Sequence, residues 1–321
     1  MAFSKQALKI NPAAESERII RWMRQNVGRR FHKQGAVVGI SGGIDSSVCL
    51  ALAARAFGPK KVLGIAMPEH ESNSESLTLA RKLAQQYGTQ FMVEEMTGPL
   101  QGFKAYARRD EAVKNVFPEF GPGYKSKIVL PPVTEKDTFN VFYLTIITPD
   151  GQEKTKRLPL TEYLQIVAAS NFKQRSRMAM LYYHADRLNY AVIGTGNKNE
   201  HEQGFFVKFG DGGADLKPIA HLFKTQVYQL AEYLGIPEEI RKRRPTTDTY
   251  SAECTQEEFF FRVPFEIGDL VWLGMEQNVP AEEIAAAAGI SVQEVINIRN
   301  DIKRKMRTAE YLKANPLQLT M

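Results

Sequence analysis

The residues with the clearest chemical potential in this chain are seven consecutive ones, Ser41-Gly42-Gly43-Ile44-Asp45-Ser46-Ser47. They lie between a short apolar run, residues 36–40, and an Ala- and Leu-rich segment, residues 48–57, which the pattern predicts as a buried strand and a helix. Such a junction offers free backbone N–H groups and the positive end of a helix dipole to an anion. The two glycines let a phosphate approach closely. The loop therefore predicts a site for a nucleotide phosphate.

Asp45 is unusual in a phosphate loop because a carboxylate repels a phosphate. A bound Mg²⁺ removes this conflict, since it takes carboxylate and phosphate oxygens together. We therefore expect Mg²⁺ as a cofactor of this site.

Alternating strand and helix patterns surround the loop. A strand is predicted at residues 61–67, a helix at 74–87 and a third strand at 90–93, and a fourth strand at 190–193 follows a helical segment over 164–188. This βαβαβ rhythm predicts an α/β fold with a doubly wound, Rossmann-like parallel sheet.

The rhythm is interrupted between residues 98 and 163, which we interpret as an insertion packed on the sheet within a single domain, residues 1–321. Two runs inside it, Phe139–Ile147 and Lys154–Leu158, flank Pro149-Asp150-Gly151 and predict a β-hairpin. Helical patterns predict an opening helix over residues 15–33, a helix from Lys224 to Leu234 and further helix over 281–312. Residues 276–321 are expected to form a helical C-terminal extension.

Composition narrows the class of protein. The 321 residues are 43% hydrophobic and 24% charged, which excludes wholesale disorder. No run approaches the roughly 20 apolar residues of a membrane helix, and the first residues lack the apolar segment of a secretory signal. With only two cysteines, we expect a protein of the reducing cytoplasm. A net charge of +6 suits either nucleic acid or a phosphate-rich small ligand.

The loop lacks the lysine of a Walker A motif and the spacing of a dinucleotide fingerprint. It resembles instead the SGGxDS loop of the PP-loop ATP pyrophosphatases, whose fold is the adenine nucleotide alpha hydrolase type and which cleave ATP between its α and β phosphates. Further motifs follow in one order, namely residues 171–178, Gly194-Thr195 with Glu200, residues 204–215, Lys224 and Pro245-Thr246. Together with the loop they resemble the ammonia-dependent NAD synthetases, over about residues 15–100 and 165–275.

The resemblance implies an ATP-dependent amide ligase with two steps. A carboxylate of deamido-NAD attacks the α-phosphate of ATP and gives an acyl-adenylate and pyrophosphate. Ammonia then displaces AMP and leaves the amide of NAD. The resemblance also implies a homodimer. No glutaminase nucleophile is evident in the sequence, so free ammonia is the expected nitrogen donor.

The same resemblance assigns roles by position. Asp45 and Glu200 would hold Mg²⁺. The matching ATP contacts are Gly39, Ile40, Ser41, Gly42, Gly43, Ile44, Asp45, Ser46, Thr195, Lys224 and Thr246. Deamido-NAD, the acid substrate, would contact Arg175, Lys208, Asp215 and Phe205. Asp45 and Lys224 would act on the polyphosphate, and we interpret Asp211 as the group that binds ammonium and accepts its proton.

Three segments depart from the family pattern. They are the long segment 98–163, the stretch Phe259-Phe260-Phe261-Arg262, and the basic run 303–307 in place of a His-Lys-Arg tail. All three fall where the acid would lie. Three alternatives therefore stay open: the same chemistry on another carboxylic acid, a PP-loop enzyme that modifies tRNA, and a nucleotide-binding module without catalysis. We expect neither a membrane nor a nucleic-acid partner in the leading interpretation.

Overall fold

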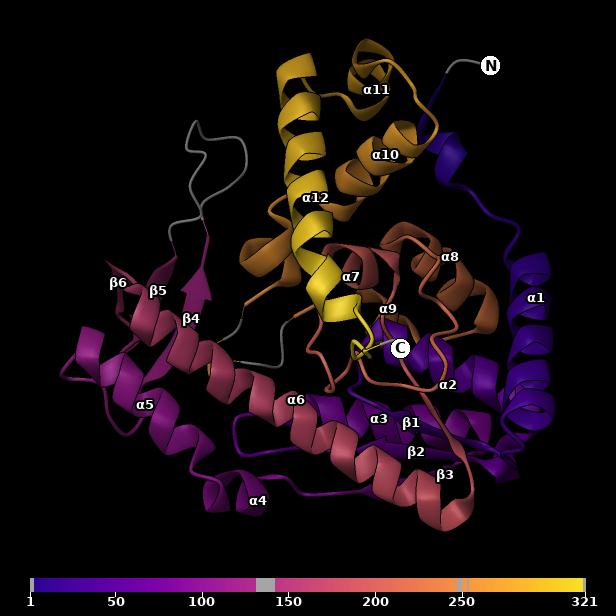
Figure 1. Cartoon of the computed structure of the whole chain (residues 1–321), viewed down its shortest axis with the longest axis horizontal. Helices are drawn as coiled ribbons and strands as arrows, with labels where there is room; N and C mark the ends of the chain where they lie inside the picture. The colour runs from indigo at the N-terminus through magenta and orange to yellow at the C-terminus, as the bar shows by residue number, and fades with distance from the viewer. Residues whose placement is uncertain (1–2, 131–141, 247–249, 253, 320–321) are drawn as a thin grey trace.

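The computed structural model describes residues 3–130, 142–246, 250–252 and 254–319 (Figure 1). Within these ranges, no helix is both long and apolar enough to cross a membrane. The elements are arranged in three regions, which are a parallel sheet with its helices, a smaller antiparallel sheet and a group of C-terminal helices (Figure 1).

The parallel sheet has the strand order β3-β2-β1-β7. Its strands are β1 (Ala36–Gly39), β2 (Val62–Ala66), β3 (Gln90–Val93) and β7 (Ala191–Ile193). All three neighbouring pairs run parallel, which confirms the predicted fold class. The apolar, β-branched character of β1, β2 and β7 suits strands that are buried on both faces.

Side chains alternate between the two faces of this sheet. Val38 and Ile193 pack with α1 (Pro12–Arg24), α2 (Ile44–Phe57), α3 (Ser74–Tyr87) and α8 (Lys224–Leu234). Val37 and Val192 pack on the opposite face against α6 (Leu160–Leu188), the long helix that crosses in front of the sheet in Figure 1. The sheet is therefore doubly wound, with one helix supplying most of the second layer.

The segment predicted as an insertion contains more structure than a hairpin. The hairpin itself is confirmed by β5 (Tyr143–Ile147) and β6 (Glu153–Arg157), which pair antiparallel. β4 (Lys125–Val129) adds a third strand, and the helices α4 (Thr97–Gly102) and α5 (Ala105–Val116) precede it. The predicted strand start at Phe139 lies outside the described residues.

The prediction that this segment packs on the parallel sheet is wrong. Its core, which includes Phe117, Ile128 and Ile146, contacts Ile166 of α6 and Tyr250 instead. The reason is that α6 and the other helices already cover both faces of the parallel sheet, so the outer surface of α6 is what remains for the segment to bury.

The C-terminal helices form a second core together with the N-terminal segment. α10 (Phe265–Glu276), α11 (Ala281–Ala288) and α12 (Val292–Lys313) enclose Trp272, and Leu8 of the 3-10 turn Lys5–Leu8 packs with them. The predicted helix over 281–312 is interrupted, because Gly289 takes a left-handed conformation with φ of 74°. Ser291 and Glu294 then form a capping box that starts α12.

Other boundaries also differ from the predictions. The opening helix ends at Arg24 and continues as a π-helical segment, Gln25–Arg30. Three further helical segments are short: α7 (Lys198–Gln203), α9 (Glu238–Lys242) and the π-helical segment η4 (Glu257–Phe261). A 3-10 turn, Pro59–Lys61, leads into β2.

A buried ionic network joins α5, α6 and the loop that follows β2. The Lys173 ammonium lies 3.0 Å from Glu69 and 2.7 Å from Glu71, and the Arg109 guanidinium lies 2.6 Å from Glu71. Tyr106 donates a hydrogen bond of 2.6 Å to Glu69. Burial alone would raise the pKa of both glutamates, but Lys173 lowers it below the usual range, so the network is ionised.

We expect Lys173→Met to destabilise the fold by about 3–5 kcal/mol, because the substitution leaves two buried carboxylates without their shared cation. Lys242→Met removes an exposed pair with Glu238 and should cost less than about 1 kcal/mol. Urea unfolding of the two variants checks the difference. Equal small losses would show that the network does not stabilise the junction.

Candidate active site

A cleft opens at the carboxyl ends of β1, β2 and β7. In the sheet, β2 lies on one side of β1 and β7 lies on the other side. The cleft is therefore at the point where the strand order reverses. Ligands of open α/β sheets bind at such switch points. The cleft volume is about 1440 Å³, which exceeds the roughly 300–1,000 Å³ of a single small-ligand site. It has room for two nucleotide-sized ligands.

The predicted phosphate loop forms one wall of this cleft. Gly42 has φ of 73°, and a Cβ there would lie 2.8 Å from the Ser76 carbonyl oxygen, so only glycine fits. The Ser46 and Ser47 hydroxyls donate to the Gly43 carbonyl oxygen at 3.0 and 2.8 Å. These two serines therefore hold the shape of the loop at the start of α2.

Two acidic side chains and one buried lysine meet beside the loop. The Lys224 ammonium, with no exposed side-chain surface, pairs with Asp45. Asn197 donates 3.0 Å from its amide nitrogen to Asp45, and its backbone N–H donates 3.1 Å to Glu200. Gln256 donates a hydrogen bond of 3.2 Å to the other Glu200 oxygen. Asn197 and Glu200 form the capping box of α7, so helix initiation itself positions Glu200.

The charges of this centre depend on one another. Burial raises the pKa of Glu200 to about 8, and the nearby Asp45 charge adds to the rise. Burial would lower the pKa of Lys224, but Asp45 and Glu200 outweigh it and raise that pKa above its usual value. The centre is thus two crowded carboxylates that share one buried cation.

The donor set fits a hard cation. Among the described residues there is no cluster of three or more His, Cys, Asp and Glu side chains that could hold a metal by itself. Two carboxylates beside a phosphate loop nevertheless suit Mg²⁺, which usually keeps several waters and binds through one or two carboxylates plus substrate phosphates. The repulsion between Asp45 and Glu200 is what such a cation would relieve.

Asp211 lines the same cleft on the glycine-rich loop after α7. Its carboxylate accepts a hydrogen bond of 2.8 Å from the Val207 N–H. The surrounding protein raises the pKa of this carboxyl to about 6, against the smaller lowering effect of Val207, Lys217 and Arg177. Asp211 itself is exposed at the surface of the cleft. Asp211 can therefore exchange a proton with a ligand near neutral pH.

The structure brings most of the predicted ATP contacts together. Ten of the eleven line the cleft, and Gly42 lies just behind them against Ser76. Asp45, Glu200, Lys224 and Asp211 all face the same space.

Of the four residues predicted to contact deamido-NAD, only some lie in the cleft. Phe205 lines the cleft, whereas Arg175, Lys208 and Asp215 are not among the described residues that line it. The Lys208 ammonium donates to the backbone oxygens of Tyr311 and Ala314, and Arg175 donates to the Lys208 carbonyl oxygen. Asp215 accepts hydrogen bonds from the Tyr182 hydroxyl and the Val192 N–H.

Several residues that build or line the site were missed in the sequence. Asn197 could have been found, because Asn-x-x-Glu at a predicted helix start is a capping signature. Gln256 carries no such signal, since it reaches Glu200 only through the folded chain. His70 after β2 carries no such signal either, whereas Gln174 and Arg177 of α6 belong to the motif at residues 171–178 without having been assigned a role.

Comparisons with known proteins agree with this geometry. A sequence profile of NAD synthase matches residues 15–118 and 146–310. The chain belongs to the NAD synthase family. Within the segment predicted as an insertion, residues 119–145 lie outside the match.

Relatives of this family member match nearly its whole length. An NH(3)-dependent NAD(+) synthetase of Rhizobium meliloti is 48% identical over 98% of this chain and 94% of the relative. One from Mesorhizobium japonicum is 49% identical over 97% of each chain. Among solved structures, an NH3-dependent NAD synthetase from Campylobacter jejuni has a TM-score of 0.63 at 21% identity, over 97% of this chain and all of that one. An NMN synthetase from Francisella tularensis has the same TM-score and identity, which supports the fold.

Lys224→Met should reduce pyrophosphate release from ATP by about 100- to 1,000-fold, the usual effect of removing one preorganised electrostatic group, measured at a temperature where circular dichroism shows the variant to be folded. Lys82→Met, which breaks an exposed pair with Glu239, is the control and should change the rate little. Steady-state pyrophosphate release checks both variants. A Lys224→Met rate within a few-fold of wild type would contradict the role of the buried cation.

Proposed function

We propose that this NAD synthase family member converts deamido-NAD, ammonia and ATP into NAD, AMP and pyrophosphate. The observation that carries the proposal is one cleft with two chemical centres. Asp45, Glu200 and Lys224 lie beside a phosphate loop, and Asp211, with its raised pKa, faces the same space. The first centre suits cleavage of a polyphosphate, and the second suits a proton transfer to or from a small amine.

In the first step, a carboxylate oxygen of the acid attacks the α-phosphorus of ATP. The bond from that phosphorus to the oxygen bridging to the β-phosphorus breaks, and pyrophosphate leaves with the electron pair. The backbone N–H groups of the phosphate loop and the Lys224 ammonium would stabilise the departing negative charge. Alignment and charge neutralisation, rather than a covalent enzyme intermediate, would supply the rate.

Asp45 and Glu200 would hold Mg²⁺, which when bound supplies charge neutralisation for the polyphosphate. Lys224 then holds the Asp45 carboxylate in place, because the two side chains are paired within the protein. Asn197 contacts both carboxylate residues and fixes their spacing.

In the second step, Asp211 accepts a proton from ammonium. The resulting ammonia attacks the carbonyl carbon of the acyl-adenylate, and the carbon–oxygen bond to AMP breaks with its electron pair leaving on AMP. The attacking nitrogen loses one further proton to water as the amide forms. An ionised Asp211 attracts the ammonium cation before it takes the proton, so a single carboxylate serves both purposes.

We propose further that the protein works as a homodimer in the cytoplasm. The support is the resemblance to a dimeric family and the scarcity of cysteines. Analytical ultracentrifugation at micromolar concentration would give twice the mass of 36.2 kDa.

The direct test is to incubate the purified protein with ATP, Mg²⁺, ammonium and deamido-NAD and to quantify NAD and AMP together. Equal amounts of NAD and AMP are expected. AMP without NAD would contradict the amidation step. No product with deamido-NAD, but AMP and an amide with nicotinate mononucleotide, would assign the same chemistry to a different acid.

Asp211→Asn should reduce amide formation far more than adenylate formation, by about 100-fold or more, because proton transfer contributes roughly that factor. Pyrophosphate release in the first turnover should stay close to wild type. Rapid-quench measurement of both products separates the steps. Equal losses in the two would rule out a role specific to the second step.

At saturating ammonium, the amide-forming step should slow as the pH falls below about 6, the pKa of Asp211, because the protonated carboxyl cannot accept a proton. The wild type should lose about tenfold per pH unit below that value. Asp211→Asn should lack this acidic limb. A limb that persists in the variant would assign the titration to another group.

A further inference from the structure

A buried ion pair on α12 contacts the wall of the cleft from behind. The Lys305 ammonium donates a hydrogen bond of 2.6 Å to the Phe260 carbonyl oxygen and lies 2.5 Å from Asp301, one turn earlier on the same helix. It also lies 4.7 Å from the centre of the Phe260 ring. Lys305 thus contacts both the backbone and the side chain of one residue of η4.

The pair is built into the protein rather than exposed on its surface. The exposed fractions of the Lys305 and Asp301 side chains are 12% and 5%. Burial lowers the pKa of Lys305, and Asp301 acts in the opposite direction. Asp301 also contacts Arg304 at 2.5 Å and Arg262 at 3.7 Å. Because a buried cation is unfavourable unless it is paired, Asp301 is what makes Lys305 available to Phe260.

Phe260 belongs to an aromatic cluster in the cleft. Its ring centre lies 4.8 Å from that of Phe205, and Phe259 lies 6.0 Å from Phe205. All three residues line the cleft. Because these rings line the same cleft as Asp211, they offer an aromatic surface to a pyridine ring whose carboxyl group is to be amidated.

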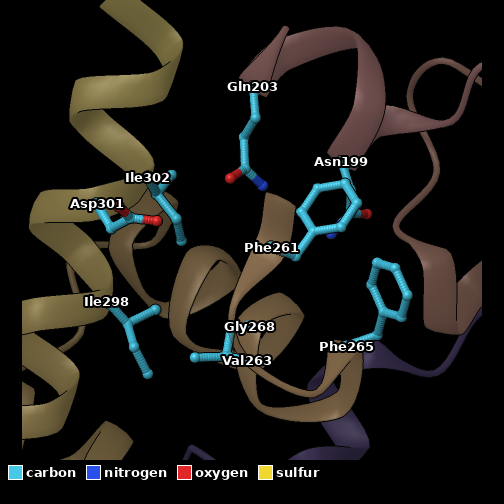
Figure 2. Close-up of a pocket in the computed structure, with 9 residues that line it drawn as sticks. All are labelled: Asn199, Gln203, Phe261, Val263, Phe265, Gly268, Ile298, Asp301 and Ile302. Atoms are coloured by element: carbon cyan, nitrogen blue, oxygen red, sulfur yellow. The ribbon is translucent and has the colours of Figure 1, made fainter. Parts of the chain in front are cut away.

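Close packing alone does not fix this wall. A small cavity lies behind it, lined on one side by Phe261 and Phe265 and on the other by Asp301 and Ile302 (Figure 2). Its volume is about 20 Å³, room for about one water molecule. The segment is π-helical and ends at Arg262 with φ of 67°, a conformation that is unfavourable for a residue with a Cβ. A polar contact such as that of Lys305 is therefore needed to hold this segment, because the neighbouring apolar side chains do not fix it by packing alone.

We infer that Lys305, held by Asp301, is a positioning residue that fixes Phe260 and thereby the aromatic wall that binds the ring of the acid substrate. The identity of that ring rests on the proposed function. The basic run 303–307 then acts on the wall through Lys305 rather than on the substrate directly.

The test compares Lys305→Met with Lys303→Met, a matched change on the exposed side of the same helix. Lys305→Met should raise the KM for deamido-NAD by about tenfold, the scale of one aromatic stacking contact. The KM for ATP and kcat should stay within about twofold of the wild type, and Lys305→Arg should restore part of the loss. Wild-type turnover, measured first, tests the proposed function by itself.

Two further measurements keep the inference independent of folding defects and of substrate identity. Hydrogen exchange should rise in residues 257–262 of Lys305→Met but not in α8. In a Phe260→Leu background, Lys305→Met should have little further effect on the KM for the acid. Unchanged exchange, an equal rise in both KM values, or additive effects of the two substitutions would each overturn the inference.

Discussion

The burial of one ammonium group against two carboxylates is the constraint on which the site depends. Lys224 has no exposed side-chain surface, so its charge requires Asp45 and Glu200 nearby. Asp45 opens α2 directly after β1, whereas Glu200 opens α7 after β7. The pairing therefore joins two helix starts at the point where the strand order reverses.

The same constraint explains how much the sequence could predict. The loop around Asp45, the four parallel strands and the span of α8 follow from local patterns, because glycine, capping and apolar periodicity act over a few residues. Ten of eleven predicted ATP contacts line the cleft for that reason. Gln256 and Lys305 could not be predicted, since each acts on a residue about 45 to 56 positions away through the folded chain. Arg175, Lys208 and Asp215 make internal hydrogen bonds in this structure, and their proposed roles toward the acid remain predictions.

Buried charges also connect the cleft to helices away from the phosphate loop. The network of Glu69, Glu71, Arg109 and Lys173 attaches α5 to the loop after β2, and His70 and Glu71 of that loop line the cleft. On the opposite side, α12 supports the aromatic wall through Lys305. α5 and α12 are thus linked to the same cleft by buried charges, while the phosphate loop is held by its own serines and by Gly42. The local contacts of the phosphate loop can be predicted from the sequence, whereas the long-range contacts of α5 and α12 cannot.

The most direct test of the central claim is isotope exchange between labelled pyrophosphate and ATP in the absence of ammonia. If the Asp45–Lys224–Glu200 centre forms an acyl-adenylate reversibly, label should enter ATP only when both Mg²⁺ and deamido-NAD are present, and adding ammonium should divert the intermediate to NAD. Exchange in the absence of deamido-NAD would contradict an acyl-adenylate at this centre. Formation of NAD without any exchange, even when pyrophosphate can rebind, would contradict it as well.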